Sequence, residues 1–387
     1  MADEITALLE TVGITPETFI VFVVIALVVV GAVVVVVTTR PILDIYPYLN
    51  PNAKVRARKG RLLTEKQLSE IADAKDIGEV ENYLSGIPDY APYLEKYPLD
   101  TALEVNLADN YNMISRVVPE KVQSSFKLMS KKVDITNIKS LISAKDVGYN
   151  VQQTKDLLIP SGSLYDLLEP LTEADSVSDI LTALDGTEYA SILEDALPRY
   201  EESQMVLELE SALDKYYLES LLNSTEVPAE ENSQILYSYI GIGIDLSILK
   251  TFVRAKQDGL TYNNISPYIL TDGYQLREWK LKDLMEANDV SSFVTYLEGT
   301  KYSEFLSDAL TEYEKTGSVT LFEKALDLHL AESAKSLSIK KPIGIGPIIG
   351  YLNKKETEIR NLKIIARAKK ETNYPVSKIM ELLVWVL

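Results

Sequence analysis

The hydrophobic and polar positions of this chain form a pattern that returns three times. Each copy is a twelve-residue segment that begins with an acid, carries a Lys five residues later and ends with an Ala-Lys pair, with apolar residues at helical spacing between them. The copies occupy residues 134–145, 245–256 and 358–369, about 112 residues apart. A pattern that recurs at one register indicates tandem duplication. We therefore predict three related helical units.

A second, weaker pattern precedes each copy. It predicts a short helix followed by a Gly in the left-handed conformation typical of a helix C-terminus. Gly86 lies 48 residues before Asp134, whereas Gly186 and Gly299 each lie 59 residues before the corresponding acids. The first unit is therefore expected to lack about three helical turns. The corresponding residues are Ile77, Val80, Leu84, Gly86, Tyr90 and Leu94; Val177, Ile180, Leu184, Gly186, Tyr189 and Leu193; and Val290, Phe293, Leu297, Gly299, Tyr302 and Leu306.

An uninterrupted apolar run extends from Phe19 to Val37. With its flanking Thr residues it forms a segment, 18–39, of about 22 residues, which as a helix spans roughly 33 Å and is long enough to cross a hydrocarbon core. A cleavable signal peptide is the alternative. The preceding residues 1–17 carry acids and no Lys or Arg, however, and the run is longer than the apolar part of a signal peptide. We predict a transmembrane helix at 18–39.

Positive charge lies on one side of this run only, at Lys54, Arg56, Arg58, Lys59 and Arg61. Because cations are retained on the cytoplasmic side of a membrane, the short segment 1–17 is expected outside the cell and the bulk of the chain in the cytoplasm. The chain would then be a single-pass protein of the cell membrane. It contains no Cys, which excludes disulfides and thiolate metal sites.

The rest of the chain is rich in Leu, Ala, Glu, Lys and Tyr, with Pro between the periodic segments, which is typical of an all-α protein. About 345 residues is too much for one hydrophobic core. We predict three helical domains, at 40–155, 156–268 and 269–387. The net charge of −18 argues against nucleic acid as a partner.

No recognisable motif for catalysis is present: the sequence lacks Gly-x4-Gly-Lys-Ser/Thr, His-Glu-x-x-His and Gly-x-Ser-x-Gly. The single His, His329, shares an apolar helical stripe with Phe322 and Leu326, which favours a core or interface role. The glycine-rich segment 344–350 resembles a nucleotide-binding loop, but it contains a Pro and fits a turn between helices better. Carboxylates are abundant, and no pair stands out. We expect no catalytic, cofactor or metal site.

Two polar residues occupy equivalent positions at the edge of the apolar stripe. Asn137 lies one helical turn after Asp134, and Asn361 has the same place in the third copy, whereas Ile248 replaces them in the second. One interpretation is a buried polar contact that fixes helix register, and the other is a contact with a partner helix. We favour register.

One stretch is locally basic within this acidic chain. Nine cations in residues 340–370 are opposed by only Glu356 and Glu358. Such a stretch is either a solvated helix face with internal ion pairs or an acceptor surface for an acidic partner or the anionic cytoplasmic leaflet.

Residues 346–369, which begin Gly-Pro-Ile-Ile-Gly-Tyr-Leu-Asn-Lys-Lys, resemble the C-terminal signature of the C subunit of archaeal A-type ATP synthases, a family related to the d subunit of the vacuolar proton pumps. Residues 55–63, Val-Arg-Ala-Arg-Lys-Gly-Arg-Leu-Leu, resemble the start of that family's domain. The resemblance implies a funnel of three similar all-helical domains around a pseudo-threefold axis. It also implies a non-catalytic central-stalk protein that couples the rotor shaft to the proton- or sodium-translocating membrane ring. The expected partners are that ring, the central shaft subunits and the lipid bilayer.

The resemblance favours the partner-facing interpretation of the basic stretch. The candidate partner-binding residues are Arg360, Asn361, Lys363, Arg367 and Lys369 in the third repeat, with Arg56 and Arg58 after the apolar run.

The apolar run departs from the family pattern, whose members are soluble. If the protein rotates, its helix must lie inside the ring, because a helix outside would collide with the static part of the ion channel. A membrane-tethered helical scaffold without a rotary role is the main alternative, and a membrane-anchored hydrolase that uses carboxylates is a third class.

Overall fold

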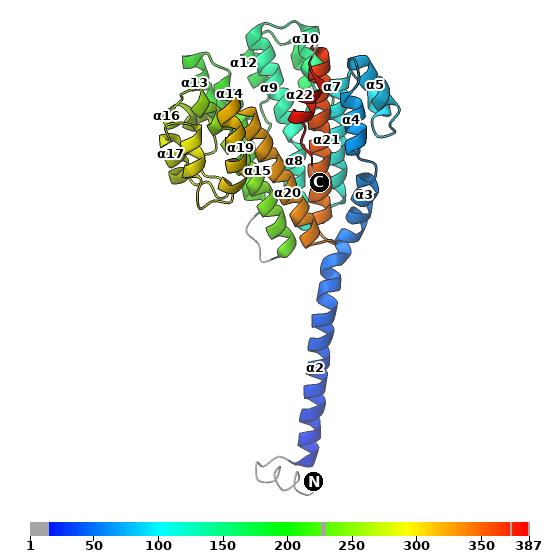
Figure 1. The fold of residues 1–387 in the computed structure, drawn as a ribbon. Coiled ribbons are helices and arrows are strands. Elements are labelled where there is room, and N and C mark those ends of the chain that lie inside the picture. Colours follow the sequence, from blue (N-terminus) through cyan, green and yellow to red (C-terminus); the bar gives the residue numbers. More distant parts are fainter. Residues whose placement is uncertain (1–14, 226–229, 372–373, 386–387) are drawn as a thin grey trace. The chain divides into compact units, whose positions relative to one another are not determined.

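The computed structural model describes residues 15–225, 230–371 and 374–385. All regular secondary structure of these residues is helical, with no strand among them (Figure 1), which confirms the all-α prediction. They fall into two compact units, one that ends at Leu49 and one that begins at Asn50. Most of the predicted external segment, residues 1–14, lies outside the described residues.

The first unit consists of α2 (Pro16–Ile45) and the short 3₁₀ helix η1 (Tyr46–Tyr48). Thr15 caps α2 by accepting a hydrogen bond from the backbone N–H of Thr18 (3.3 Å). Large apolar side chains of α2 are exposed, with fractions from 39% at Phe19 to 66% at Leu27. By length and composition α2 is sufficient to cross a membrane. Helix α15 (Glu231–Gln257) passes the same test, but it is mostly buried and serves as a core helix.

The second unit contains all remaining helices. They are α3 (Leu49–Lys59), α4 (Glu65–Ala72), α5 (Ile77–Ser85), α6 (Ala91–Leu94), α7 (Leu99–Val117), α8 (Glu120–Ser130), α9 (Lys132–Val147), α10 (Val151–Leu157), α11 (Tyr165–Leu168), η2 (Glu169–Glu173), α12 (Val177–Ala183), α13 (Ala190–Ser203), α14 (Leu207–Ser224), α15 (Glu231–Gln257), α16 (Tyr262–Ile265), η3 (Ser266–Tyr268), α17 (Glu278–Glu286), α18 (Val290–Tyr296), α19 (Ser303–Thr316), α20 (Thr320–Lys340), α21 (Gly346–Lys370) and α22 (Val376–Leu382).

Three long hairpins form the centre of this unit. The first pairs α7 with α8 and its continuation α9, the second pairs α14 with α15, and the third pairs α20 with α21. Helix α8 contacts α14 and α15 contacts α20, so each hairpin packs on the next. The second helix of the third hairpin, α21, packs on α7 of the first hairpin (Figure 1). The three hairpins are therefore packed in a closed cycle.

Two packed cores of the described residues each combine the end of one sequence repeat with the start of another. One core joins α9 to α12, α13 and α14, through residues such as Leu141, Ile180 and Leu213. Another joins α21 and α22 to α4, α5 and α7, through Leu362 and Leu84. The repeats predicted at 40–155, 156–268 and 269–387 therefore do not coincide with these packed cores.

The three copies of the main pattern lie on α9, α15 and α21, as predicted. Gly186 and Gly299 have φ of 81° and 82°, which confirms the left-handed prediction. The prediction is wrong at Gly86, where φ is −79°. In the first copy three residues, one of them Pro88, separate the Gly from Tyr90, whereas the other copies have two. The backbone of this turn therefore has a different conformation. The shortening of the first unit is found at α6. This helix is ten residues shorter than α13 and α19, the corresponding helices of the other two units.

Two glycines allow α20 and α21 to approach closely. A Cβ at Gly346 would lie 2.7 Å from the carbonyl oxygen of Lys341 and 2.8 Å from that of Leu337. A Cβ at Gly350 would lie 2.8 Å from Ser338 Oγ. Because these distances are shorter than a carbon contact allows, only glycine fits the crossing. The Gly-x-x-x-Gly spacing thus serves the packing of two helices.

Candidate functional site at the closure of the chain

The acid that opens each repeated helix is buried and accepts hydrogen bonds from the start of another repeat. Asp134, Asp245 and Glu358 are at most 5% exposed. In the first two copies the backbone donor lies 29 or 30 residues downstream, but in the third it lies 295 residues upstream. The third repeated helix therefore contacts the start of the first repeat, at Leu63. The donors are the N–H groups of Leu164 for Asp134, of Tyr274 and Gln275 for Asp245, and of Leu63 for Glu358.

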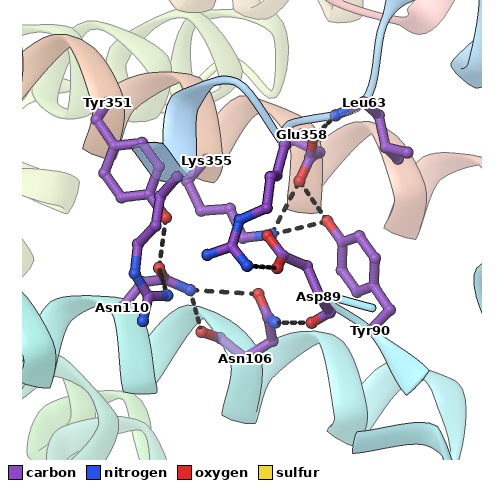
Figure 2. Close-up of polar contacts among 10 residues, drawn as sticks. Leu63, Asp89, Tyr90, Asn106, Asn110, Tyr351, Lys355 and Glu358 are labelled. Carbon is purple, nitrogen blue, oxygen red and sulfur yellow. Dashed lines mark hydrogen bonds and ion pairs between the residues drawn. The ribbon is translucent and has the colours of Figure 1, made fainter. Parts of the chain in front are cut away.

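Figure 2 shows this closing site around Glu358. Its carboxylate accepts hydrogen bonds from the Leu63 N–H and from the Tyr90 hydroxyl. Lys355 Nζ lies 2.9 Å from Glu358 Oε1 and 2.9 Å from the Tyr90 hydroxyl, and 4.3 Å from the centre of the Tyr90 ring. The site thus joins α21 to the segment before α4 and to the turn before α6.

The closing site is a buried ion pair. Lys355 is 2% exposed and Glu358 is 5% exposed. Burial, and then the charge of Glu358, raise the pKa of Tyr90 well above its usual value, so Tyr90 stays a neutral donor. Loss of one partner of such a pair leaves an uncompensated buried charge, which costs more than loss of both. Removal of either Lys355 or Glu358 alone is therefore expected to destabilise the fold more than removal of both.

A chain of polar side chains continues from this site onto α7 (Figure 2). Because Tyr351 is buried, the pKa of its hydroxyl is raised to about 12. This series of hydrogen-bonded side chains connects the segment after α3 to both α7 and α21. Its links run from Arg61 to Asp89 (3.2 Å), from Asn106 to the Asp89 carbonyl (2.7 Å), from Asn110 to the Asn106 carbonyl (2.7 Å), and from Arg58 (3.2 Å) and Tyr351 to the Asn110 side chain.

Helix α3 is also hydrogen-bonded to the turn between α20 and α21. The buried Asn52 side chain donates to the carbonyl of Gly344 (2.7 Å) and accepts from its N–H (3.1 Å). Arg56 donates to the carbonyl of Pro342 (2.6 Å). The Ile345 N–H donates to the Asn232 side chain (3.0 Å). The N–H groups of Gly344 and Ile345 therefore donate hydrogen bonds within the protein. This confirms the interpretation of the glycine-rich segment as a turn between two helices.

The repeated Lys forms an ion pair with a helix of the neighbouring hairpin in every copy. Lys139 pairs with Asp214 (2.6 Å), Lys250 with Asp327 (2.6 Å) and Lys363 with Glu104. Burial lowers the pKa of Lys363. The closing Lys of the first two copies donates to a carbonyl at the end of a neighbouring helix: Lys145 to Thr172 (2.7 Å) and Lys256 to Met285 (2.9 Å).

The repeated Asn is buried and hydrogen-bonds to the backbone of a segment that follows it in the sequence. Asn137 both donates to and accepts from the backbone of Ile159 (2.9 and 2.8 Å). Asn361 does the same with Val384 (2.9 and 3.0 Å). Asn361 is 1% exposed and its amide is hydrogen-bonded to Val384, so it does not offer a surface to a partner, in contrast to its place among the partner-binding candidates.

The other candidates lie in two separate places. Arg367 is exposed and Lys369 half-buried at the end of α21. Arg56 and Arg58 lie near its beginning, where Arg58 and Tyr351 share Asn110. The 16 residues between Tyr351 and Arg367 correspond to roughly 24 Å along a helix, so the structure does not bring the two groups together.

Arg360 also belongs to an internal pair. It lies against Asp327 of α20, the same carboxylate that pairs with Lys250. With Lys363 paired to Glu104, two of the predicted partner-facing cations instead connect helices within the fold. Their reversal to Glu would place like charges together inside the protein.

His329 is half-buried on α20, where its contacts are with aromatic side chains, as expected for a core or interface histidine. Its ring stacks on Phe305 with centroids 4.0 Å apart, and burial lowers its pKa. Within the described part of the chain, no group of three His, Asp or Glu side chains is arranged to hold a metal ion.

A second carboxylate of α21, the half-buried Glu356, holds another contact that was not predicted from the sequence. Tyr111 of α7 and Tyr239 of α15 both donate to it, Tyr239 at 3.5 Å. Burial, and then the charge of Glu356, raise the pKa of both tyrosines well above the usual value. One helix from each predicted repeat meets here, but the spacing of these residues in the sequence gives no signal of it.

Comparison with known proteins identifies the class to which this all-helical fold belongs. The model of the ATP synthase (C/AC39) subunit family matches residues 51–382. The chain belongs to this family. The resemblance to the C subunit of A-type ATP synthases, inferred from the sequence, is also confirmed.

Three relatives are named as the C subunit of an A-type ATP synthase. The protein of Methanobrevibacter smithii is 62% identical over 384 residues, which cover 99% of this chain and 100% of the relative. That of Methanothermobacter thermautotrophicus is 48% identical with the same coverage. That of Methanocaldococcus jannaschii is 39% identical over 351 residues, 88% of each chain. The first two alignments include the apolar N-terminal helix.

Proposed function

We propose that this chain is a non-catalytic central-stalk component of an A-type ATP synthase, which couples the rotor shaft to the ion-translocating membrane ring. The observation that carries the proposal is the closed cycle of three hairpins, in which α21 returns to α7 and Glu358 binds the Leu63 N–H. A closed cycle resists being pulled open from any one side, as a part that transmits torque must. The closed cycle also supports the proposal that three similar helical domains form a funnel around a pseudo-threefold axis.

The polar chain at the closing site supports the same role. Helix α3 follows the apolar helix in the sequence. Its Asn52 and Arg56 bind the α20–α21 turn, and its Arg58 binds α7. Force on α3 is therefore distributed over α7 and the α20–α21 turn rather than over a single contact. Arg367 and Lys369 remain proposed contacts for another protein of the complex, because their end of α21 is at least partly exposed.

We further propose that residues 18–39 of α2 span the membrane, with the N terminus outside and the helical domains in the cytoplasm. The exposed apolar side chains of α2 and the cations that follow it support this orientation. Protease added to intact cells is expected to leave the helical domains undigested. Their digestion from outside would reverse the orientation.

The proposed function is tested by mild-detergent purification through a tag placed after the last residue. The ring and shaft proteins are expected to co-purify with the chain in constant proportion. A membrane-tethered scaffold predicts that the chain is recovered without either of them. The control is an untagged strain, which should yield neither protein on the same resin.

A further inference from the structure

Two neighbouring cavities lie between α3, α20 and α21. One, of about 160 Å³, is lined by Lys59, Lys335 and Lys354 among others. The other, of about 310 Å³, is lined by Arg56 and Lys59. Both include Lys59, Ser338 and Ile339, so they form one continuous hollow, which we call the basic trench.

The charge of the basic trench is unusual for this protein. Its four cations come from three helices, and no carboxylate is among the described residues that line the two cavities. The chain as a whole has a net charge of −18. Burial, followed by the charges of Lys59 and Lys335, lowers the pKa of Lys354, while Glu65 acts weakly in the opposite direction. A bound anion would relieve this repulsion.

Apolar side chains lie beside these cations. Ile339, at the end of α20, lines both cavities and is 69% exposed, and Val55, Pro342 and Pro347 line the larger one. A site that offers ammonium groups next to exposed hydrocarbon matches a ligand with a phosphate and an apolar portion. A free phosphate ion would use only the cations.

The covalent connection of the trench favours the membrane as the source of this ligand. Arg56 and Lys59 lie on α3, which begins four residues after the end of α2 at Ile45. Cations that follow a membrane-spanning helix so closely are attracted to anionic lipid headgroups. Arg56 and Lys59 therefore follow the end of the proposed span by 17 and 20 residues in the sequence.

We propose that the basic trench binds the phosphate of an anionic phospholipid headgroup. Arg56, Lys59, Lys335 and Lys354 supply the positive charge, and Ile339 contacts the apolar part of the lipid. This inference rests on the proposed function in one respect only, the membrane location of α2.

The test measures binding of fluorescent phosphatidylglycerol to the full-length chain in dodecylmaltoside micelles. The Lys59→Gln/Lys354→Gln variant is expected to bind at least tenfold more weakly than the unchanged chain. The matched control, Lys66→Gln/Lys75→Gln, removes two exposed cations that pair with Glu70 and Glu79 and should bind normally. Helical content is compared by circular dichroism, and Lys59→Gln alone repeats the test if the double variant misfolds.

Two further arms identify the source of the phosphate. Phosphatidylcholine should bind no better to the unchanged chain than to the trench variant, and millimolar inorganic phosphate should fail to displace phosphatidylglycerol. Equal binding by the trench and control variants would overturn the inference, as would full displacement by inorganic phosphate. Because the isolated chain is used, failure of the ring to co-purify leaves this result unaffected.

Discussion

Replacement of Glu358 by Leu is expected to destabilise the helical unit by about 3–5 kcal/mol. The change leaves the Lys355 ammonium buried without its carboxylate, and it removes the acceptor of the Tyr90 hydroxyl and the Leu63 N–H. Each of these groups is costly to bury without a partner. Urea unfolding of the full-length protein in detergent, followed by circular dichroism, measures the effect as a shift in the midpoint.

Two control variants show whether the closure itself is responsible. Lys355→Met/Glu358→Leu removes both charges and should recover part of the loss, because no isolated ion remains buried. Asp214→Leu breaks the partly exposed pair with Lys139 and should cost only about 0–1 kcal/mol. An equal cost for Glu358→Leu and Asp214→Leu would mean that the closing site contributes no more than a surface ion pair.

Local patterns were enough to predict the helices and their repetition. The apolar stripes of residues 134–145, 245–256 and 358–369 depend only on neighbours three and four positions away, and all three lie on helices. The closure was not predicted, because a repeat period does not say where a structural unit begins. In the structure the early block at 77–94 packs against the third repeated helix, through residues such as Leu84 and Leu362.

The roles of the charged residues were harder to predict. The cations of residues 340–370 suggested a surface because the sequence near them contains few acids. Their partners lie far away along the chain: Glu104 is 259 residues from Lys363, and Asp327 lies on the preceding helix, opposite Arg360. The repeated acid and Lys were visible as a pattern, but the pairing that explains them depends on how the hairpins pack.

The second large effect concerns the apolar helix. A helix of about 10 Å diameter attached to a rotating body can avoid the static part of the ion channel only if it lies on the rotation axis. Residues 19–37 contain no polar side chain, which suits ring-enclosed lipid or an apolar inner wall. A helix that rotates with the ring can be joined to it covalently without stopping rotation, whereas one joined to the static channel protein stops it.

The most direct test is therefore a photocrosslinking residue at Val29 in the assembled enzyme, with ATP-driven ion pumping measured before and after irradiation. We expect crosslinks to the inward-facing helix of the ring or to enclosed lipid, with pumping retained at the level of the unirradiated control. Crosslinks to the static channel protein, or a loss of pumping in proportion to the crosslink yield, would contradict the proposal that this chain rotates with the ring.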